Sequence, residues 1–219
     1  MSRIAIIDYG LGNLASVKRA VGHVAPTGTD VVVTADAAMI NSADRIIFPG
    51  QGAARDAMAA LAQRGLLDLL SSWVDRPFLG LCLGLQILFE RTAENGGVDL
   101  MGRFAGDVVR LQPSRTENPG EVVRGGRIKI PHMGWNRVES LGDHPLWAGV
   151  RSQEAWFYFV HSYHVRPLDA DIVQGYAEHG QRFVAAVASG NLFAMQPHPE
   201  KSAETGLTVL RNFVHWNGR

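Results

Sequence analysis

The chain has 219 residues, 46% of them hydrophobic and 19% charged, and its 21 Lys and Arg residues balance its 21 Asp and Glu residues. This length can bury one sizeable core, so we expect a single domain over residues 1–219, and the zero formal charge gives no electrostatic argument for nucleic acid or membrane as a partner. One cysteine excludes an intrachain disulfide, and with no membrane-length apolar run or signal peptide we expect a cytoplasmic protein.

The first half of the chain alternates short apolar runs with helical patterns. Apolar residues at helical spacing predict helices over Leu14 to Val24 and over Ala53 to Val74, the latter broken near Gly65. Continuous apolar runs without polar alternation predict strands at Arg3 to Asp8, Asp30 to Thr34, Arg45 to Phe48 and Phe78 to Cys82. Strands of this kind, separated by helices, indicate an α/β fold: a mostly parallel, flavodoxin-like sheet covered by helices on both faces.

From about Phe104 onward the pattern changes to short strands separated by turn residues. We expect most of them to be antiparallel, forming a second β-rich layer of the same domain. The predicted strands are Asp107 to Leu111, Arg127 to Ile130, Trp135 to Glu139, Trp156 to Val165, Ile172 to Glu178, Arg182 to Ala188 and Leu192 to Gln196. The polar stretch Ser114 to Gly126 predicts a surface loop, and Glu204 to Trp216 predicts a closing amphipathic helix.

The only cysteine stands where a predicted strand meets a helix-like stretch, Leu83 to Glu90. Cys82 has a glycine two positions away on either side, which is the Gly-x-Cys-x-Gly pattern of a nucleophile elbow. Such a corner exposes the side chain at the edge of the sheet, at a helix N-terminus that favours a thiolate. The alternative is that Cys82 is simply a small buried core residue.

A histidine and a carboxylate follow the last predicted strand. His198 and Glu200 alternate with Pro197 and Pro199, and prolines favour extended geometry that would direct both polar side chains to one side. The imidazole could then take the proton of Cys82, while Glu200 binds the other ring N–H. The alternative is a surface-loop histidine beside a solvated acid.

Attack by cysteine on an amide carbonyl creates an oxyanion that requires preorganised N–H donors. One candidate is the backbone N–H of Leu83, directly after the cysteine. The other lies at the strand-to-loop junction Gly50-Gln51-Gly52, where the glycines allow a peptide to face inward or to invert. The alternative is an ordinary glycine-rich turn.

In order and spacing, Phe48-Pro-Gly-Gln-Gly52, Gly80-Leu-Cys-Leu-Gly-Leu-Gln86 and His198-Pro-Glu-Lys-Ser202 resemble the class I, triad-type glutamine amidotransferase domain. Further segments resemble motifs of the glutaminase subunits of imidazole glycerol phosphate synthases: Asp8 to Asn13, Pro131 to Asn136 and Tyr158 to Tyr163. The chain departs from the family pattern at Gln51, where an apolar β-branched residue is usual, and at Pro197, where an aromatic residue is usual.

The resemblance implies that Cys82 attacks L-glutamine, His198 is the base and then the acid, and Glu200 orients it. It also implies a heterodimer in which ammonia passes to a barrel-shaped synthase partner, without a cofactor or metal. The residues it implies are Gly50, Gln51 and Leu83 for the oxyanion, Gly52, Gln86, Ser162 and Tyr163 for substrate, and Asn13, Met133, Trp135 and Tyr158 for the partner.

Three other interpretations stay open at this point. Another class I glutaminase would share the triad and differ only in its partner. A dinucleotide-binding protein is suggested by Gly10 to Ala15, which matches Gly-x-Gly-x-x-Ala, followed by Asp36. A non-catalytic flavodoxin-like scaffold would leave Cys82 without a chemical role.

Overall fold

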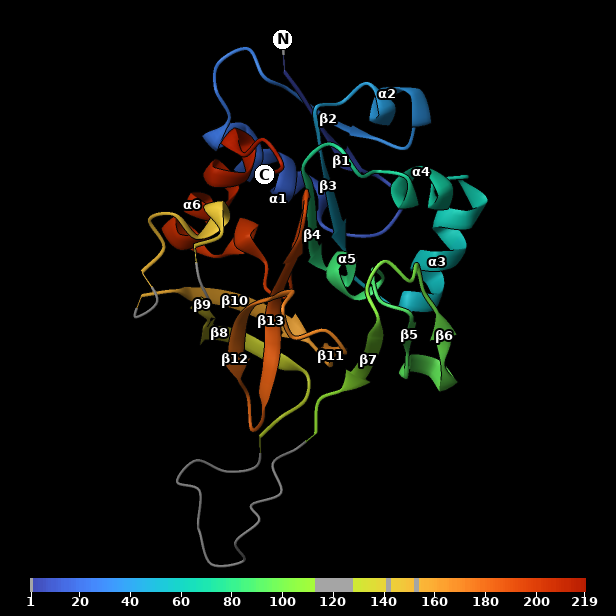
Figure 1. Ribbon diagram of the computed structural model, residues 1–219, viewed down its shortest axis with the longest axis vertical. Coiled ribbons are helices and arrows are strands. Elements are labelled where there is room, and N and C mark those ends of the chain that lie inside the picture. Colours follow the sequence, from blue (N-terminus) through green and yellow to red (C-terminus); the bar gives the residue numbers. More distant parts are fainter. Residues whose placement is uncertain (1, 113–127, 141–142, 152–153) are drawn as a thin grey trace, which may run out of the picture.

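The computed structural model describes residues 2–112, 128–140, 143–151 and 154–219, and it is organised around one large sheet (Figure 1). The strand order of this sheet is β2-β1-β3-β4-β14-β13-β12-β9. Its strands are β1 (Arg3–Ile7), β2 (Asp30–Thr34), β3 (Arg45–Gly50), β4 (Phe78–Cys82), β9 (Glu139–Ser140), β12 (Val173–Glu178), β13 (Arg182–Ser189) and β14 (Leu192–Met195). The five strands from β2 to β14 pair in parallel, and the remaining pairings are antiparallel.

Helices cover both faces of the sheet, as the sequence predicts. Alternate residues of β1 enter two separate cores: Ala5 and Ile7 pack with α2, α3 and α4, while Ile4 and Ile6 pack with α1 and α6. Figure 1 shows these two groups of helices on opposite sides of the strands. The helices are α1 (Leu14–Val24), α2 (Ala37–Asn41), α3 (Ala54–Gln63), α4 (Leu67–Ser71), α5 (Leu83–Gln86) and α6 (Ala203–His215).

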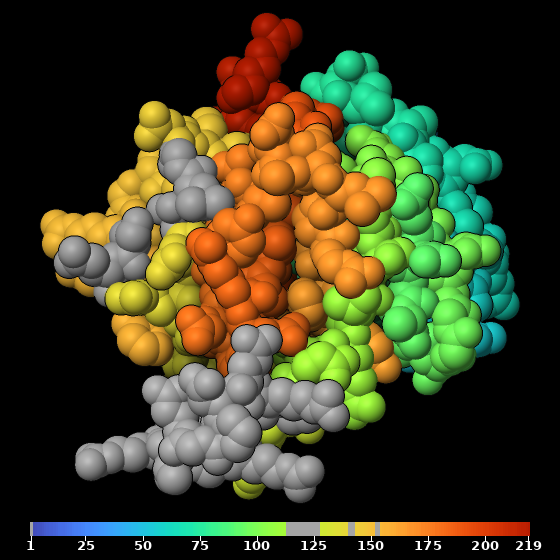
Figure 2. Space-filling model, turned by 60° about the horizontal axis from the view of Figure 1, so that its bottom comes forward, coloured from blue at the N-terminus to red at the C-terminus, as the bar shows by residue number. Residues whose placement is uncertain are grey.

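Two smaller sheets contain the remaining strands of the described residues, and all their pairings are antiparallel except that of β5 with β7, which is parallel. One, here called the β8–β10 ribbon, pairs β8 (His132–Arg137) with β10 (Trp156–His161). The other has the order β11-β7-β5-β6 and contains β11 (Tyr163–Pro167), β7 (Gly106–Arg110), β5 (Arg91–Thr92) and β6 (Val98–Asp99). Three 3-10 turns are η1 (Glu94–Gly96), η2 (Pro145–Trp147) and η3 (Pro199–Lys201). On the face that Figure 2 shows, residues of the C-terminal half, in orange, occupy the middle, with green residues of the first half beside them.

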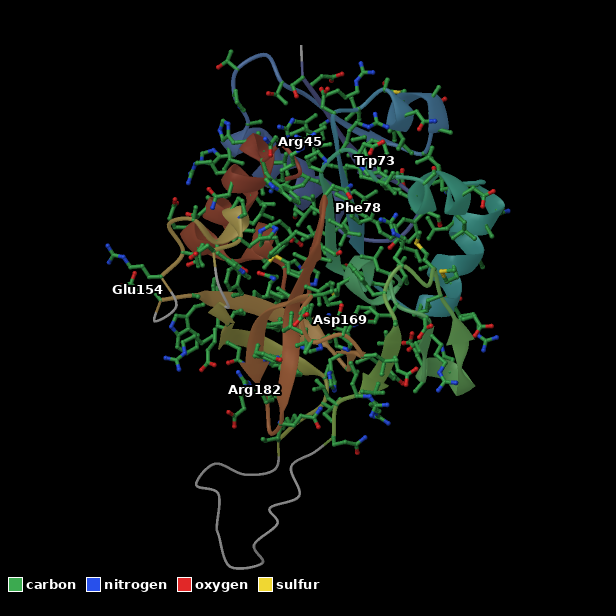
Figure 3. All side chains as sticks on the ribbon, in the orientation of Figure 1. Arg45, Trp73, Phe78, Glu154, Asp169 and Arg182 are labelled. Atoms are coloured by element: carbon green, nitrogen blue, oxygen red, sulfur yellow. The ribbon has the colours of Figure 1, made fainter. Side chains whose placement is uncertain are left out.

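The mixed α/β class with a large, mostly parallel sheet and extra antiparallel strands is therefore confirmed. The antiparallel strands β13, β12 and β9 continue this sheet rather than lying wholly in a second layer. Phe78 and Trp73 are buried, whereas Glu154 lies at the edge of the molecule in Figure 3. None of the helices in the described ranges combines the length and apolar character needed to cross a bilayer.

Several predicted boundaries are wrong. The helix after Cys82 ends at Gln86 instead of Glu90, because the buried residues that follow form turns. The strand predicted from Trp156 to Val165 is two strands of different sheets, separated at Ser162. Residues 128–130 form no strand, since pairing starts beyond Pro131, at His132. Residue 127 and the predicted loop Ser114 to Gly126 lie outside the described residues.

Candidate active site

The cysteine stands at a strained corner between β4 and α5. Cys82 has φ 54° and ψ −108°, a conformation that side chains other than glycine rarely adopt, and it is 6% exposed. A Cβ at Gly84 would overlap the carbonyl oxygen of Phe48, and one at Gly80 would lie 2.8 Å from the carbonyl oxygen of Gly84. Both glycines therefore allow the close backbone approach that forms the corner.

The predicted histidine follows β14, which pairs in parallel with β4. His198 is extended (φ −101°, ψ 94°), but Pro199–Lys201 forms a 3-10 turn, so the extended geometry predicted through Glu200 is wrong. The turn still brings the side chains together: His198 Nδ1 lies 2.8 Å from Glu200 Oε1, and the two side chains are 3% and 2% exposed.

The pKa of His198 is set by two opposing effects: its burial, and its contacts with Cys82 and Glu200. Burial lowers the pKa of its imidazole, whereas interactions with Cys82 and with Glu200 raise it, and the net effect is a pKa of about 10. Within the described part of the chain, His198 Nε2 is buried and has no hydrogen-bond partner. One ring nitrogen is thus held by Glu200, and the other remains available beside the thiol.

The backbone around His198 is fastened to the β8–β10 ribbon. The His198 N–H donates to the carbonyl oxygen of Tyr158 at 2.9 Å. The hydroxyl of Ser202 donates to the carbonyl oxygen of His198 and accepts from the N–H of Tyr158 at 2.9 Å. The position of the imidazole therefore depends on the position of β10.

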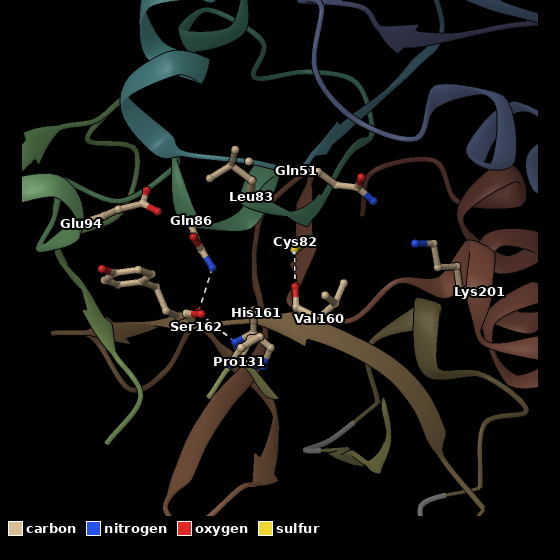
Figure 4. A pocket seen from close by; sticks show the side chains of 12 residues that line it. Gln51, Cys82, Leu83, Gln86, Glu94, Pro131, Val160, His161, Ser162 and Lys201 are labelled. Carbon is tan, nitrogen blue, oxygen red and sulfur yellow. Dashed lines mark hydrogen bonds between the residues drawn. The ribbon is translucent and has the colours of Figure 1, made fainter. Parts of the chain in front are cut away.

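Cys82 opens on a pocket of about 400 Å³ (Figure 4). In Figure 4, Glu94 and Lys201 lie at opposite ends of the pocket, with Cys82 between them. The lining contains six of the residues predicted around the cysteine, namely Gln51, Gly52, Leu83, Gln86, Ser162 and Tyr163. Residues without a predicted role also line it: Glu94, Pro131, Val160, His161 and Lys201.

Gly50, predicted beside the oxyanion, pairs with Cys82 in the β3–β4 ladder and does not line the pocket. A Cβ at Gly50 would lie 2.5 Å from the Tyr9 hydroxyl and 2.7 Å from Leu83 Cβ. Leu83 is the first residue of α5, so its N–H is among those that a helix leaves unpaired in its first turn. The residues predicted around the oxyanion therefore lie side by side.

Glu94 is the main residue that sequence reasoning missed. It lies in η1 and accepts a hydrogen bond at 2.7 Å from the N–H of Ala54. No sequence motif indicates Glu94. It lies in the short connection between β5 and β6, which belong to a different sheet from Cys82, and only the fold brings it to the pocket. Lys201, in contrast, stands inside the His-Pro-Glu-Lys-Ser segment and could have been singled out from that position.

Three of the four predicted partner residues lie on the β8–β10 ribbon. Met133 and Trp135 are 63% and 52% exposed, and Tyr158 pairs directly with Trp135, with ring centroids 6.3 Å apart. Lys201 Nζ lies 5.7 Å from the centroid of the Tyr158 ring. The fourth residue, Asn13, is half-buried and caps α1 by accepting from the N–H of Ser16.

The dinucleotide interpretation finds no support in the geometry. Asp36, the proposed ribose ligand, caps α2 by accepting from the N–H of Met39 at 2.8 Å, and the pocket at Cys82 involves neither it nor the Gly10 segment. No group of three or more His, Cys, Asp or Glu side chains among the described residues is arranged to hold a metal ion.

Comparison with known proteins gives consistent matches over the whole chain. The model of the family "Glutamine amidotransferase class-I" matches residues 5–216. The chain is 48% identical to "Imidazole glycerol phosphate synthase subunit HisH" of Thiobacillus denitrificans, covering 98% of this chain and 91% of the relative. It is 50% identical to the protein of the same name from Dechloromonas aromatica, covering 97% and 96%. A solved structure titled as a glutamine amidotransferase shares the fold, with a TM-score of 0.66 at 17% identity over 97% of each chain.

Proposed function

The chain belongs to the class-I glutamine amidotransferase family, and from this premise we propose that it hydrolyses L-glutamine and delivers the ammonia to a synthase subunit. The relatives named imidazole glycerol phosphate synthase subunit HisH support histidine biosynthesis as the pathway. The observation that carries the proposal is the buried Cys82, His198 and Glu200 group beside a pocket large enough for a small molecule.

In the proposed reaction, Cys82 Sγ attacks the side-chain amide carbon of glutamine and forms a C–S bond. His198 takes the thiol proton and gives it to the departing nitrogen, so that the C–N bond breaks and ammonia leaves. Water then cleaves the thioester and releases glutamate. Glu200, 2.8 Å from His198 Nδ1, fixes the tautomer and the orientation of the ring.

The oxyanion that forms at each step needs two donors near the sulfur. We assign one to the N–H of Leu83 and the other to the Gly50–Gln51 peptide, which must turn its N–H toward the pocket. A carboxylate at one end of the pocket suits the ammonium group of the substrate, and Glu94 is therefore our candidate for it. Gly52, Gln86, Ser162 and Tyr163 remain the proposed contacts to the rest of glutamine.

Ammonia that escapes into water is protonated and loses its nucleophilicity, so direct transfer to a second active site is required. We assign the docking surface for a barrel-shaped synthase subunit to the exposed side chains Met133 and Trp135, together with Tyr158, which pairs with Trp135, and with Asn13 at the start of α1. Because the ribbon also fastens the His198 backbone, docking would act on the site directly. A nucleophilic thiol must stay reduced, which supports a cytoplasmic location.

The test is to treat the chain with 6-diazo-5-oxo-L-norleucine, an electrophilic glutamine analogue, with and without a candidate synthase subunit. We expect the label on Cys82, faster labelling in the presence of the synthase, and no label on the Cys82→Ala variant. Glutamine hydrolysis should be slow for the chain alone and should rise with the synthase and its ligand. Labelling elsewhere, or an unchanged hydrolysis rate for Cys82→Ala, would reject the proposal.

The partner surface requires its own measurement. Trp135→Ala should weaken binding of the synthase subunit, measured by calorimetry, by about 10-fold or more if Trp135 is an interface anchor. Val74→Ala changes another exposed apolar side chain, 57% exposed and beyond the end of α4, away from the β8–β10 ribbon, and serves as the control. Equal affinities for Trp135→Ala and the unsubstituted chain would move the interface elsewhere.

A further inference from the structure

The backbone carbonyl of Tyr163 joins two chains of buried hydrogen bonds. It accepts from Gln86 Nε2 at 2.9 Å and, on its other side, from His161 Nδ1 at 2.9 Å. A carbonyl oxygen can only accept, so both of these partners must donate. The direction of every bond further along either chain is then fixed.

The first chain leads to the nucleophile. Gln86 Nε2 also donates to Gln196 Oε1 at 3.0 Å, which leaves the amide nitrogen of Gln196 facing Cys82 Sγ at 3.5 Å. Gln196 is fully buried, and it does not line the pocket. Its amide therefore contacts the sulfur without reaching a bound substrate, and the N–H groups of Gln86 are already engaged, so only Gln86 Oε1 remains for a ligand.

The second chain leads to the β8–β10 ribbon. His161 must carry its hydrogen on Nδ1, so its Nε2 accepts from His132 Nδ1, which lies 2.9 Å away. His132 Nε2 then accepts from the amide nitrogen of Asn136 at 3.2 Å, and the same amide donates to the carbonyl oxygen of Glu178 at 2.7 Å. Burial lowers the pKa of His132 to about 4 and that of His161 to about 3, so both rings are neutral near pH 7.

We propose that Gln196 is a positioning residue for the Cys82 nucleophile, oriented by the Tyr163 carbonyl so that its amide always presents a donor to the sulfur. The proposal deepens the glutaminase function proposed above and rests on it only for the consequence in turnover. If Gln196 were reversed, its oxygen would face the electron-rich sulfur and its nitrogen would face the Gln86 amide nitrogen. The nitrogen-to-nitrogen contact would be repulsive and the sulfur would lose its donor, so the network admits one orientation.

The orientation has a chemical consequence. A donor at the sulfur is most favourable when the sulfur is negatively charged, and it restrains the side chain at a corner that is already strained. Loss of one hydrogen bond to a charged group corresponds to about 10-fold to 100-fold in rate. Because Gln196 does not touch the pocket, the loss should appear in kcat and not in KM.

The experiment compares Gln196→Leu and Gln196→Met, which keep the approximate volume but remove the donor, with the full unsubstituted chain. The rate of alkylation of Cys82 by iodoacetamide, measured without glutamine, should fall about 10-fold or more in both variants. Gln181→Leu is the matched control, because it removes a glutamine that contacts His164 at 2.8 Å in a different hydrogen-bond group. Its alkylation rate should stay within about 2-fold of the original.

Glutamine turnover with the synthase subunit gives the second measurement. We expect kcat to fall in parallel with alkylation while KM stays within about 2-fold, and circular dichroism reports the folded fraction used to normalise both rates. If neither hydrophobic variant folds, Gln196→Glu provides the test, because a carboxyl group donates a hydrogen bond only when it is protonated. As pH rises and this carboxyl loses its proton, the alkylation rate of the variant should fall further and further below that of the unsubstituted chain at the same pH.

The outcomes separate the two proposals. Alkylation at the original rate in folded Gln196→Leu and Gln196→Met, or in Gln196→Glu at every pH, would overturn the positioning role, whatever the turnover. Slowed alkylation in a chain that never hydrolyses glutamine, even with its partner, would support the positioning role and reject the glutaminase function.

Discussion

Acidification should destabilise the folded protein through two neighbouring histidines of the buried network, His132 and His161. His132 and His161 have pKa values of about 4 and about 3 in the folded chain, caused first by burial, against an ordinary value near 6.5. A second proton on His161 would also place N–H against N–H at the 2.9 Å contact with His132. The unfolded chain therefore binds protons more tightly, and the stability that is complete above about pH 6.5 falls as pH decreases.

The magnitude follows from the two values. At about pH 4.5 each histidine costs about 2.5 kcal/mol, so the pair removes about 5 kcal/mol from a total that is about 5–15 kcal/mol for a domain. His144, whose pKa burial also lowers to about 4, adds a loss of similar size, and His164, whose pKa burial lowers as well, contributes in the same direction. The lowered pKa values of Asp44 and Asp107 keep both carboxylates charged at that pH, so they contribute only in stronger acid.

Urea unfolding followed by tryptophan fluorescence at about pH 7 and at about pH 4.5 measures this loss. His132→Gln supplies the comparison, because glutamine can donate toward His161 and accept from Asn136 without titrating. The variant should lose about 2–3 kcal/mol less on acidification than the unsubstituted chain, and the contribution of His144 cancels in the difference. Equal losses in the two proteins would refute the reasoning.

Three further outcomes can be checked. The Tyr9 hydroxyl is buried without a hydrogen-bond partner among the described residues, so Tyr9→Phe should leave the free energy of unfolding in urea unchanged or raise it by about 1 kcal/mol. A free energy of unfolding lowered by more than about 1 kcal/mol would show that the hydroxyl has a partner. Gly84→Ala should abolish the folded elbow through overlap with Phe48, while Gly22→Ala, where an added Cβ meets nothing within 4 Å, should stabilise α1 by about 0.5–1 kcal/mol; thermal unfolding ranks the two. Burial lowers the pKa of His198, but Cys82 and Glu200 raise it more, to about 10. Protonated His198 therefore stabilises the fold fully below about pH 6.5, and this contribution is lost as pH rises to about 10. His198→Gln should remove this pH dependence, measured by urea unfolding between about pH 6.5 and about pH 10.

The parallel part of the fold could be predicted because its inner strands are buried on both faces, and even the half-buried edge strand β2 is a continuous apolar run. Continuous apolar runs such as the one in β1 have few other interpretations, and the predicted strands from Arg3 to Cys82 match the observed ones within two residues. The ends of the antiparallel strands are less predictable from sequence, because they depend on which strand each one pairs with. Ser162 separates β10 from β11 only because the two strands pair with different sheets.

The site divides in the same way. The elbow at Cys82 and the contact between His198 and Glu200 depend on residues within four positions of each other, so local pattern was enough to indicate them. Gln196 and Gln86 are 110 positions apart and meet as one hydrogen bond, and Glu94 reaches the pocket on a 3-10 turn. No local signal distinguishes such residues from ordinary polar ones, because their roles arise only when distant strands come together.

A ladder of only two strands has fewer hydrogen-bonded neighbours than a wider sheet, so it depends on the packing of its inner face, which here includes the buried Phe157 and Phe159. The β8–β10 ribbon has this construction, and its Met133 and Trp135 face outward while its Tyr158 backbone grips the loop that carries the imidazole. Pressure on the outer side chains would therefore reach the reactive group as a small tilt. The ribbon therefore connects the exposed side chains Met133 and Trp135 mechanically to the backbone of His198.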